Sequence, residues 1–163
     1  MSDIGADDGA LPFFMMGEFK AVFPSGLNYT TNHMWATPVA TGGNAVVAWR
    51  FGLTSYAVRL LQDVYFLDWI VNAGSDIKRR QQLGSIESKK AESDLYSPTA
   101  GQLVSYNQQA LSDPSVINVD IYNEGWLMEI TPTSEVDLIS VDAYLKHLEQ
   151  AWVVAQRTIK GQV

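Results

Sequence analysis

Short apolar runs separated by turn residues dominate the middle of the chain. β-branched and aromatic residues are concentrated at 45–51 and 64–70, and another apolar run occupies 83–87. Segments containing glycine and asparagine, at 42–44 and 72–76, separate these runs. Runs of this length, rich in β-forming residues and bounded by turn residues, are typical of strands. The pattern therefore predicts a mainly β domain.

Two segments instead have a helical pattern. Residues 54–61 predict a short helix after the first strands, with Thr54 as its N-cap. The C-terminal segment 141–160 predicts a longer helix, which Ser140 or Asp142 would cap. Its apolar residues recur at three- and four-residue spacing: Val141, Tyr144, Leu145, Leu148, Trp152 and Ala155. We expect this apolar face to cover the open side of the β domain.

The first 28 residues are rich in glycine and aspartate but contain an apolar patch at 11–16. We expect this patch to pack on the protein itself, and packing on another subunit is the open alternative. The chain then divides into an N-terminal extension (1–28), a β domain (29–140) and a C-terminal helix (141–163).

Composition narrows the possible functions. The 163 residues fit one domain, and the formal net charge of −7 argues against a nucleic-acid partner. The absence of cysteine excludes disulfides and thiolate metal sites and fits a cytoplasmic protein. The acidic N-terminus lacks the basic start of a secretory signal, and no segment argues for a membrane. His33 and His147 are the only histidines; we expect a packing role for His33 and a surface or packing role for His147.

The most informative segment is 87–98, which reads Glu-Ser-Lys-Lys-Ala-Glu-Ser-Asp-Leu-Tyr-Ser-Pro. It places lysines between the predicted strand at 83–87 and a proline-marked turn. A lysine between two short strands stands at an exposed hairpin tip, where a modifying enzyme can reach its amine.

This segment resembles the lipoylation site of glycine cleavage system H proteins, which typically reads Glu-Ser-Val-Lys-Ala-Ala-Ser-Asp before a Tyr-Ser-Pro turn. Three other segments resemble motifs of the same family in the same order: 29–35, 52–57 and 120–127. The chain departs from the family pattern at Met34, Ser55, Lys89 and Glu92, and in the turn at 69–74.

The resemblance implies a barrel-sandwich hybrid fold of the lipoyl/biotinyl-domain type. It also implies that lipoate is attached to Lys90 as an amide, and that Lys89 is only a neighbouring charge. Residues that match the family around the site would take part in recognition: Glu87, Ser88, Ala91, Ser93 and Asp94. We interpret Glu92 as a charge that keeps an exposed sheet edge from pairing with other chains, and the same role is the open alternative for Glu87.

The function implied by the resemblance is that of a non-catalytic carrier. Its lipoyl arm would take an aminomethyl group from glycine decarboxylase (P protein) and present it to the aminomethyltransferase (T protein). Dihydrolipoamide dehydrogenase (L protein) would reoxidise the arm, and a lipoate-attaching enzyme would install it. The dithiol chemistry would come from the cofactor, because no catalytic side-chain motif is present.

Other functions remain open at this point. A lipoate-binding protein that serves a heterodisulfide-reductase-like sulfur oxidation complex would have the same modification and different client enzymes. An unmodified interaction module would retain the fold and lose the cofactor. A biotin carrier is disfavoured because biotin sites typically have methionine on both sides of the lysine, whereas Lys90 lies between Lys89 and Ala91.

Overall fold

A computed structural model describes residues 11–40 and 46–161 of the chain. The predicted turn at 42–44, the start of the strand predicted at 45 and the first ten residues of the extension lie outside the described residues. None of the described helices is long and apolar enough to cross a bilayer.

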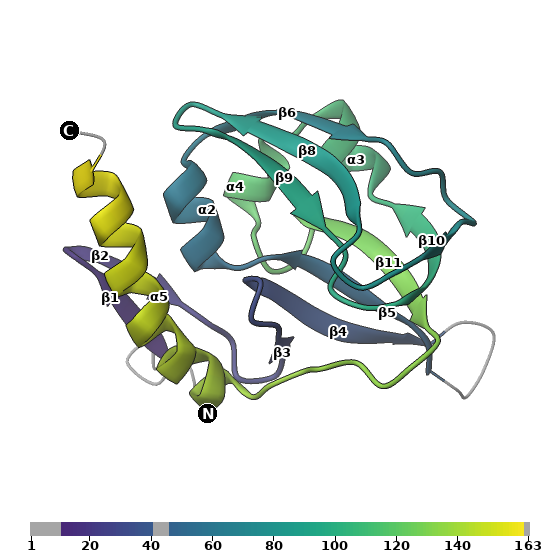
Figure 1. Ribbon diagram of the computed structural model, residues 1–163, viewed down its shortest axis with the longest axis horizontal. Coiled ribbons are helices and arrows are strands. Elements are labelled where there is room, and N and C mark those ends of the chain that lie inside the picture. The colour runs from purple at the N-terminus through teal and green to yellow at the C-terminus, as the bar shows by residue number, and fades with distance from the viewer. Residues whose placement is uncertain (1–10, 41–45, 162–163) are drawn as a thin grey trace.

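Two antiparallel sheets form the body of the molecule (Figure 1). The larger has the strand order β3-β4-β5-β11-β10-β7, and the smaller has the order β6-β8-β9. The strands of the larger sheet are β3 (Asn28–Tyr29), β4 (Met34–Ala40), β5 (Val46–Leu53), β7 (Asp76–Ile77), β10 (Gly101–Tyr106) and β11 (Trp126–Pro132). Those of the smaller sheet are β6 (Val64–Trp69), β8 (Gln82–Ser88) and β9 (Glu92–Tyr96).

Alternation of buried and exposed side chains explains how the sheets face one another. In β10, Leu103 is fully buried, whereas its neighbours Gln102 and Val104 are exposed. Side chains from the larger sheet, such as Phe51 and Ile130, share one core with Leu83 and Ile86 of the smaller sheet. The period of two therefore directs one face of each strand into a common interior. This arrangement confirms the predicted mainly β, barrel-sandwich fold.

Short helices close the body. The helix α2 (Ser55–Leu61) follows β5, and the Thr54 side chain accepts a hydrogen bond from the Ala57 amide, as the sequence predicted. The sequence analysis did not predict α3 (Gln108–Ser112) and α4 (Val116–Val119), which lie between β10 and β11. Both are about one turn long and are stabilised by packing, since Ala110 and Ile117 are buried in the main core.

The long helix α5 (Val141–Gly161) and the N-terminal extension form a second layer (Figure 1). The Ser140 hydroxyl accepts a hydrogen bond from the Ala143 amide, which confirms Ser140 as a cap. A second core, separate from the one between the sheets, buries Tyr144 and Leu148 of α5 against Tyr29 and Phe23.

The extension forms a hairpin that the sequence analysis did not predict. Strand β1 (Phe13–Met16) pairs with β2 (Phe19–Val22), and Gly17, with φ of 64°, lies in the connection between them. Met16 is 6% exposed and packs in the second core, whereas Met15 is 44% exposed on the opposite side of β1. The expectation that the extension packs on the protein itself is therefore confirmed for one face of the hairpin.

Candidate functional site

Lys90 stands at the tip of the β8–β9 hairpin, as predicted, and its side chain is exposed. The last paired residues before the tip are Glu87 and Glu92. Beyond them the Ser88 amide donates to the Ala91 carbonyl at 2.8 Å, which leaves Lys89 and Lys90 as the two residues of the turn.

The turn is held by the Ser88 side chain. Two-residue hairpins usually require left-handed residues, but neither Lys89 nor Lys90 has a positive φ. Instead the buried Ser88 hydroxyl accepts hydrogen bonds from the amides of Lys90 (3.2 Å) and Ala91 (3.1 Å) and donates to the Ala91 carbonyl. Local bonds of this kind replace the usual turn geometry and position the backbone of Lys90.

The two lysines face different surroundings. The Lys89 amide donates to the Asp63 carbonyl at 2.8 Å, which ties the tip to the start of β6. The Lys89 side chain borders a cavity of about 370 Å³ that Asp63 and Asn118 also line. Lys90 borders a separate cavity of about 160 Å³, beside Met16 and Trp152.

The residues around the tip divide between the interior and the edge of the sheet. Ser88 is buried, whereas Ala91, Ser93 and Asp94 are exposed. Strand β9 is an edge strand of the smaller sheet, and its only buried side chain is Leu95. The exposure of Glu92 on this edge agrees with our interpretation of it as a charge that discourages pairing with other chains.

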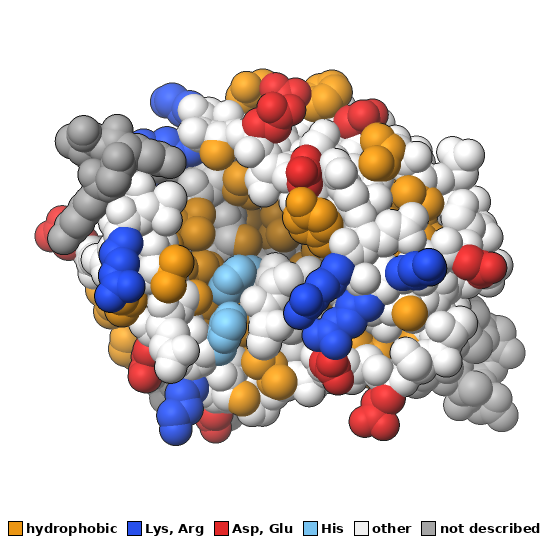
Figure 2. Space-filling view, viewed as in Figure 1, with side chains coloured by type: hydrophobic (Ala, Val, Ile, Leu, Met, Phe, Trp, Pro, Cys, Tyr) orange, Lys and Arg blue, Asp and Glu red, His pale blue; other side chains and the backbone are white. Residues whose placement is uncertain are grey.

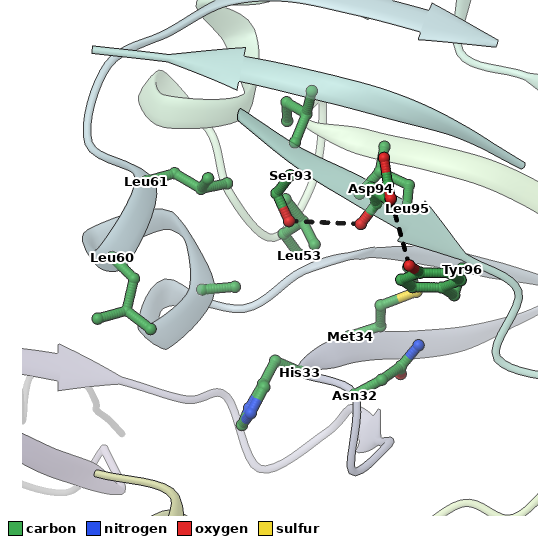
Figure 3. Close-up of a pocket in the computed structure, with 12 residues that line it drawn as sticks. Asn32, His33, Met34, Leu53, Leu60, Leu61, Ser93, Asp94, Leu95 and Tyr96 are labelled. Atoms are coloured by element: carbon green, nitrogen blue, oxygen red, sulfur yellow. Dashed lines mark hydrogen bonds between the residues drawn. The ribbon is translucent and has the colours of Figure 1, made fainter. Parts of the chain in front are cut away.

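A hollow lies beside β9, between the smaller sheet and α2 (Figure 2). Its volume is about 220 Å³, and most of its lining is apolar. Figure 3 shows Leu60 and Leu61 of α2 on one side, with Ser93, Asp94 and Tyr96 of β9 on another. The Tyr96 hydroxyl donates to the Asp94 carboxylate at 3.3 Å, so a carboxylate borders this mostly apolar space.

His33 borders the same hollow and belongs to a buried hydrogen-bond network. Its Nδ1 lies 2.8 Å from the Tyr144 hydroxyl, which lies 2.8 Å from Thr54 Oγ1. Burial, reinforced by the nearby His147, lowers the pKa of His33 to about 4. Burial also raises the pKa of Tyr144 well above its usual range. At neutral pH the network is therefore uncharged, and the packing role predicted for His33 is confirmed.

The sequence analysis did not predict this hollow or the network. Asp94 was identified only as a match to the family, and Tyr144 only as an apolar position of α5. His33 and Tyr144 are 111 residues apart in the chain, so no local pattern links them. Among the residues that the structure describes, no cluster of three or more histidine, aspartate or glutamate side chains could hold a metal ion.

The fold and the site together define a small β carrier domain, in which an exposed lysine is presented at a hairpin tip of a barrel-sandwich. The family model for the glycine cleavage H-protein matches residues 27–153. The chain therefore belongs to the glycine cleavage H-protein family.

Individual relatives support this assignment. The glycine cleavage system H protein of Rubrobacter xylanophilus is 38% identical over 130 residues, which are 80% of this chain and 98% of that protein. The H protein of Myxococcus xanthus is 37% identical over 131 residues, 78% of this chain and 96% of its own. The crystal structure of the Mycobacterium marinum H protein superposes with a TM-score of 0.68 at 31% identity, covering 78% of this chain and 99% of that one.

These comparisons confirm the predicted family and the carrier role in the glycine cleavage system. No observation favours the sulfur-oxidation alternative. The modified lysine and the residues that surround it remain predictions, as do the boundaries of the three parts of the chain.

Proposed function

We propose that this protein carries lipoate on Lys90 and shuttles an aminomethyl group between the enzymes of the glycine cleavage system. The observation that supports this most directly is the position of Lys90, exposed at a two-residue hairpin tip inside the matched motif. A lipoyl group on Lys90 would supply the chemistry, because its S–S bond can break as one sulfur bonds to the aminomethyl carbon, whose electron pair leaves the other sulfur as a thiol. The protein itself supplies the position of the arm and has no turnover of its own.

The backbone around Lys90 suits recognition by a lipoate-attaching enzyme. Hydrogen bonds that the Ser88 hydroxyl and the Asp63 carbonyl accept from backbone amides hold the tip in one geometry, while the Lys90 amine is exposed. Amide formation removes the positive charge of Lys90. The carrier then becomes one unit more acidic than its formal net charge of −7.

The hollow beside β9 suits the loaded end of the arm. Asp94 lies four residues after Lys90, or about 13 Å along an extended strand, which a lysine extended by an eight-carbon acid can span. An aminomethyl group is a cation at neutral pH, and the Asp94 carboxylate at the rim would attract it. His33 is uncharged at that pH and would not repel the cation.

Three client enzymes would dock around this face: glycine decarboxylase, aminomethyltransferase and dihydrolipoamide dehydrogenase. The acidic balance of the chain favours basic patches on these partners and association that weakens with salt. We further propose that all of these encounters take place in the cytoplasm.

Intact mass spectrometry tests the attachment. Incubation with a lipoate ligase should add one lipoyl group to the wild-type protein and to Lys89→Ala, but none to Lys90→Ala. Lys89→Ala is the matched control, because the two lysines are adjacent in the same turn. Loss of the modification in Lys89→Ala alone would place the attachment site one residue earlier.

Labelled glycine tests the clients. With a lipoyl group verified on Lys90, the glycine decarboxylase of the same organism should transfer the methylene carbon of glycine to the carrier. Absence of label on verified lipoyl protein would contradict the glycine cleavage role and favour the sulfur-oxidation alternative.

A further inference from the structure

The β1–β2 hairpin of the N-terminal extension lies close to Lys90. Lys90 borders a cavity of about 160 Å³, and the other residues that line it are Met16, Arg59, Leu60, Gln62 and Trp152. Met16 comes from β1 and Trp152 from α5, while Leu60 and Arg59 belong to α2. Three segments that are far apart in the sequence therefore meet beside the hairpin tip.

The extension is held firmly against α2 at this point. Met16 pairs with Phe19 across the β1–β2 turn, and the Arg59 guanidinium lies 4.4 Å from the centre of the Phe19 ring. Trp152 contacts Tyr56 of α2 edge-to-face, with ring centres 6.4 Å apart. The Arg59 guanidinium is engaged with the Phe19 ring, so the apolar part of the lining is formed by Met16, Leu60 and Trp152, with Gln62 and Lys90 as its other polar members.

One of these apolar side chains, Met16, comes from outside the matched part of the chain, whereas Leu60 and Trp152 lie within it. The family match begins at residue 27, so Met16 lies outside it. The Rubrobacter xylanophilus protein is matched over 98% of its length by 80% of this chain, so this chain has residues without a counterpart there. The hairpin therefore adds Met16 to the surroundings of Lys90 from outside the matched region.

We propose that Met16, Leu60 and Trp152 form a resting site for the dithiolane end of the unloaded arm, a site completed by the N-terminal hairpin. This inference rests on the proposed lipoylation of Lys90. The unloaded arm is an apolar chain ending in a disulfide-containing ring, and the cavity that Lys90 itself borders offers apolar walls. The thioether of Met16 and the indole of Trp152 are polarizable partners for sulfur. The loaded arm bears a cation and prefers the Asp94 side of the tip, so the two states of the arm use different surfaces.

Methyl NMR of ¹³C-methionine-labelled protein tests the resting site, on samples whose lipoylation is verified by intact mass. The Met16 methyl resonance should shift between the unmodified and lipoylated forms. The Met15 resonance should stay in place, because Met15 is exposed on the opposite side of the same strand. Reduction of the dithiolane should weaken the shift of Met16.

A second measurement follows the protection of the disulfide. A water-soluble phosphine reduces the dithiolane and becomes the phosphine oxide, while the two sulfurs take up two electrons and two protons. Met16→Ala should be reduced several-fold faster than wild type, whereas Met15→Ala and the volume-conserving Met16→Leu should be reduced at the wild-type rate.

The outcomes separate the two proposals. Lack of a lipoyl mass increase overturns the attachment and the resting site together. A verified lipoyl group with unmoved Met16 resonances and equal reduction rates overturns the resting site alone. Because the NMR comparison uses the wild-type sequence, it remains decisive even if Met16→Ala disturbs the hairpin.

Discussion

The β8–β9 tip and the cluster around Tyr144 are organised in opposite ways. The tip presents Lys89 and Lys90 to solvent and is held by one serine and a single long-range backbone bond. In the cluster, Tyr144 is fully buried, stacks on Tyr29 with ring centres 5.0 Å apart, and bonds to His33 and Thr54. The comparison shows that the residues of the buried cluster are distinct from the residues that present the exposed Lys90 side chain.

Removing the Tyr144 side chain should produce the largest effect. Tyr144→Ala should lower the free energy of unfolding by about 3–5 kcal/mol, because it leaves a cavity in the second core and unpaired partners. Tyr144→Phe retains the ring and should lose only about 1–2 kcal/mol. Chemical denaturation measures both. The control Lys90→Ala should remain within about 0.5 kcal/mol of wild type. If Lys90→Ala proved as unstable as Tyr144→Ala, the tip would contribute to the stability of the fold as much as the buried cluster does, against our expectation.

Acid should destabilise the cluster before it affects the tip. The pKa of His33 is about 4 in the folded protein, against 6.5 for an unperturbed histidine, so the unfolded chain binds more protons between these values. The contribution of His33 to the free energy of unfolding is fully present above pH 6.5 and is lost as the pH falls toward 4. The total loss is about 3 kcal/mol. Urea denaturation at a series of pH values measures the decline. His33→Asn tolerates the positive φ of 69° and should flatten the decline; an unchanged slope would assign it to other groups.

Ser88→Ala should affect the tip more than the fold. It removes the acceptor of the Lys90 and Ala91 amides and should lower stability by about 1–2 kcal/mol. We also expect slower lipoylation, because the backbone of Lys90 is no longer held, and a timed ligase reaction followed by mass measures this. Ser112→Ala is the control, since Ser112 is an exposed serine at the end of α3 and lies outside the segment expected to take part in recognition. Equal rates in the two variants would show that the ligase does not need a rigid tip.

The smallest effect is expected at the cross-strand pair of Glu87 and Glu92. Like charges opposite one another are unfavourable, so Glu92→Gln should raise stability by a few tenths of a kcal/mol, and Glu92→Lys by slightly more. Thermal unfolding at low and high salt measures the gain, which should shrink with salt. If Glu92→Gln instead strongly slows lipoylation, our interpretation of Glu92 as an edge charge is wrong and it belongs to the recognition surface.

Local patterns predicted the parts of the fold that local residues determine. The cap of α2 at Thr54 and the hairpin tip at Lys90 could be predicted because the sequence pattern for each lies within a few neighbouring residues. The β1–β2 hairpin had a local signal in Gly17 between two apolar runs, but its strands are only four residues long and were not predicted. The hollow and the network of His33 with Tyr144 depend on contacts between distant segments, which no single stretch of sequence reveals.

The turn that carries Lys90 also has a consequence for how this protein can change. Because neither Lys89 nor Lys90 has a positive φ, no position in the turn requires glycine or asparagine. L-Amino acids other than proline can occupy either place without a left-handed backbone, provided that Ser88 is kept; proline would remove the amide that donates to the Asp63 carbonyl or to the Ser88 hydroxyl. The turn is therefore suitable for protein engineering, because cysteine or a non-natural amino acid that replaces the lysine would have the same exposed position. The same tolerance would allow mutation during evolution to alter the attached chemistry while the scaffold stays intact.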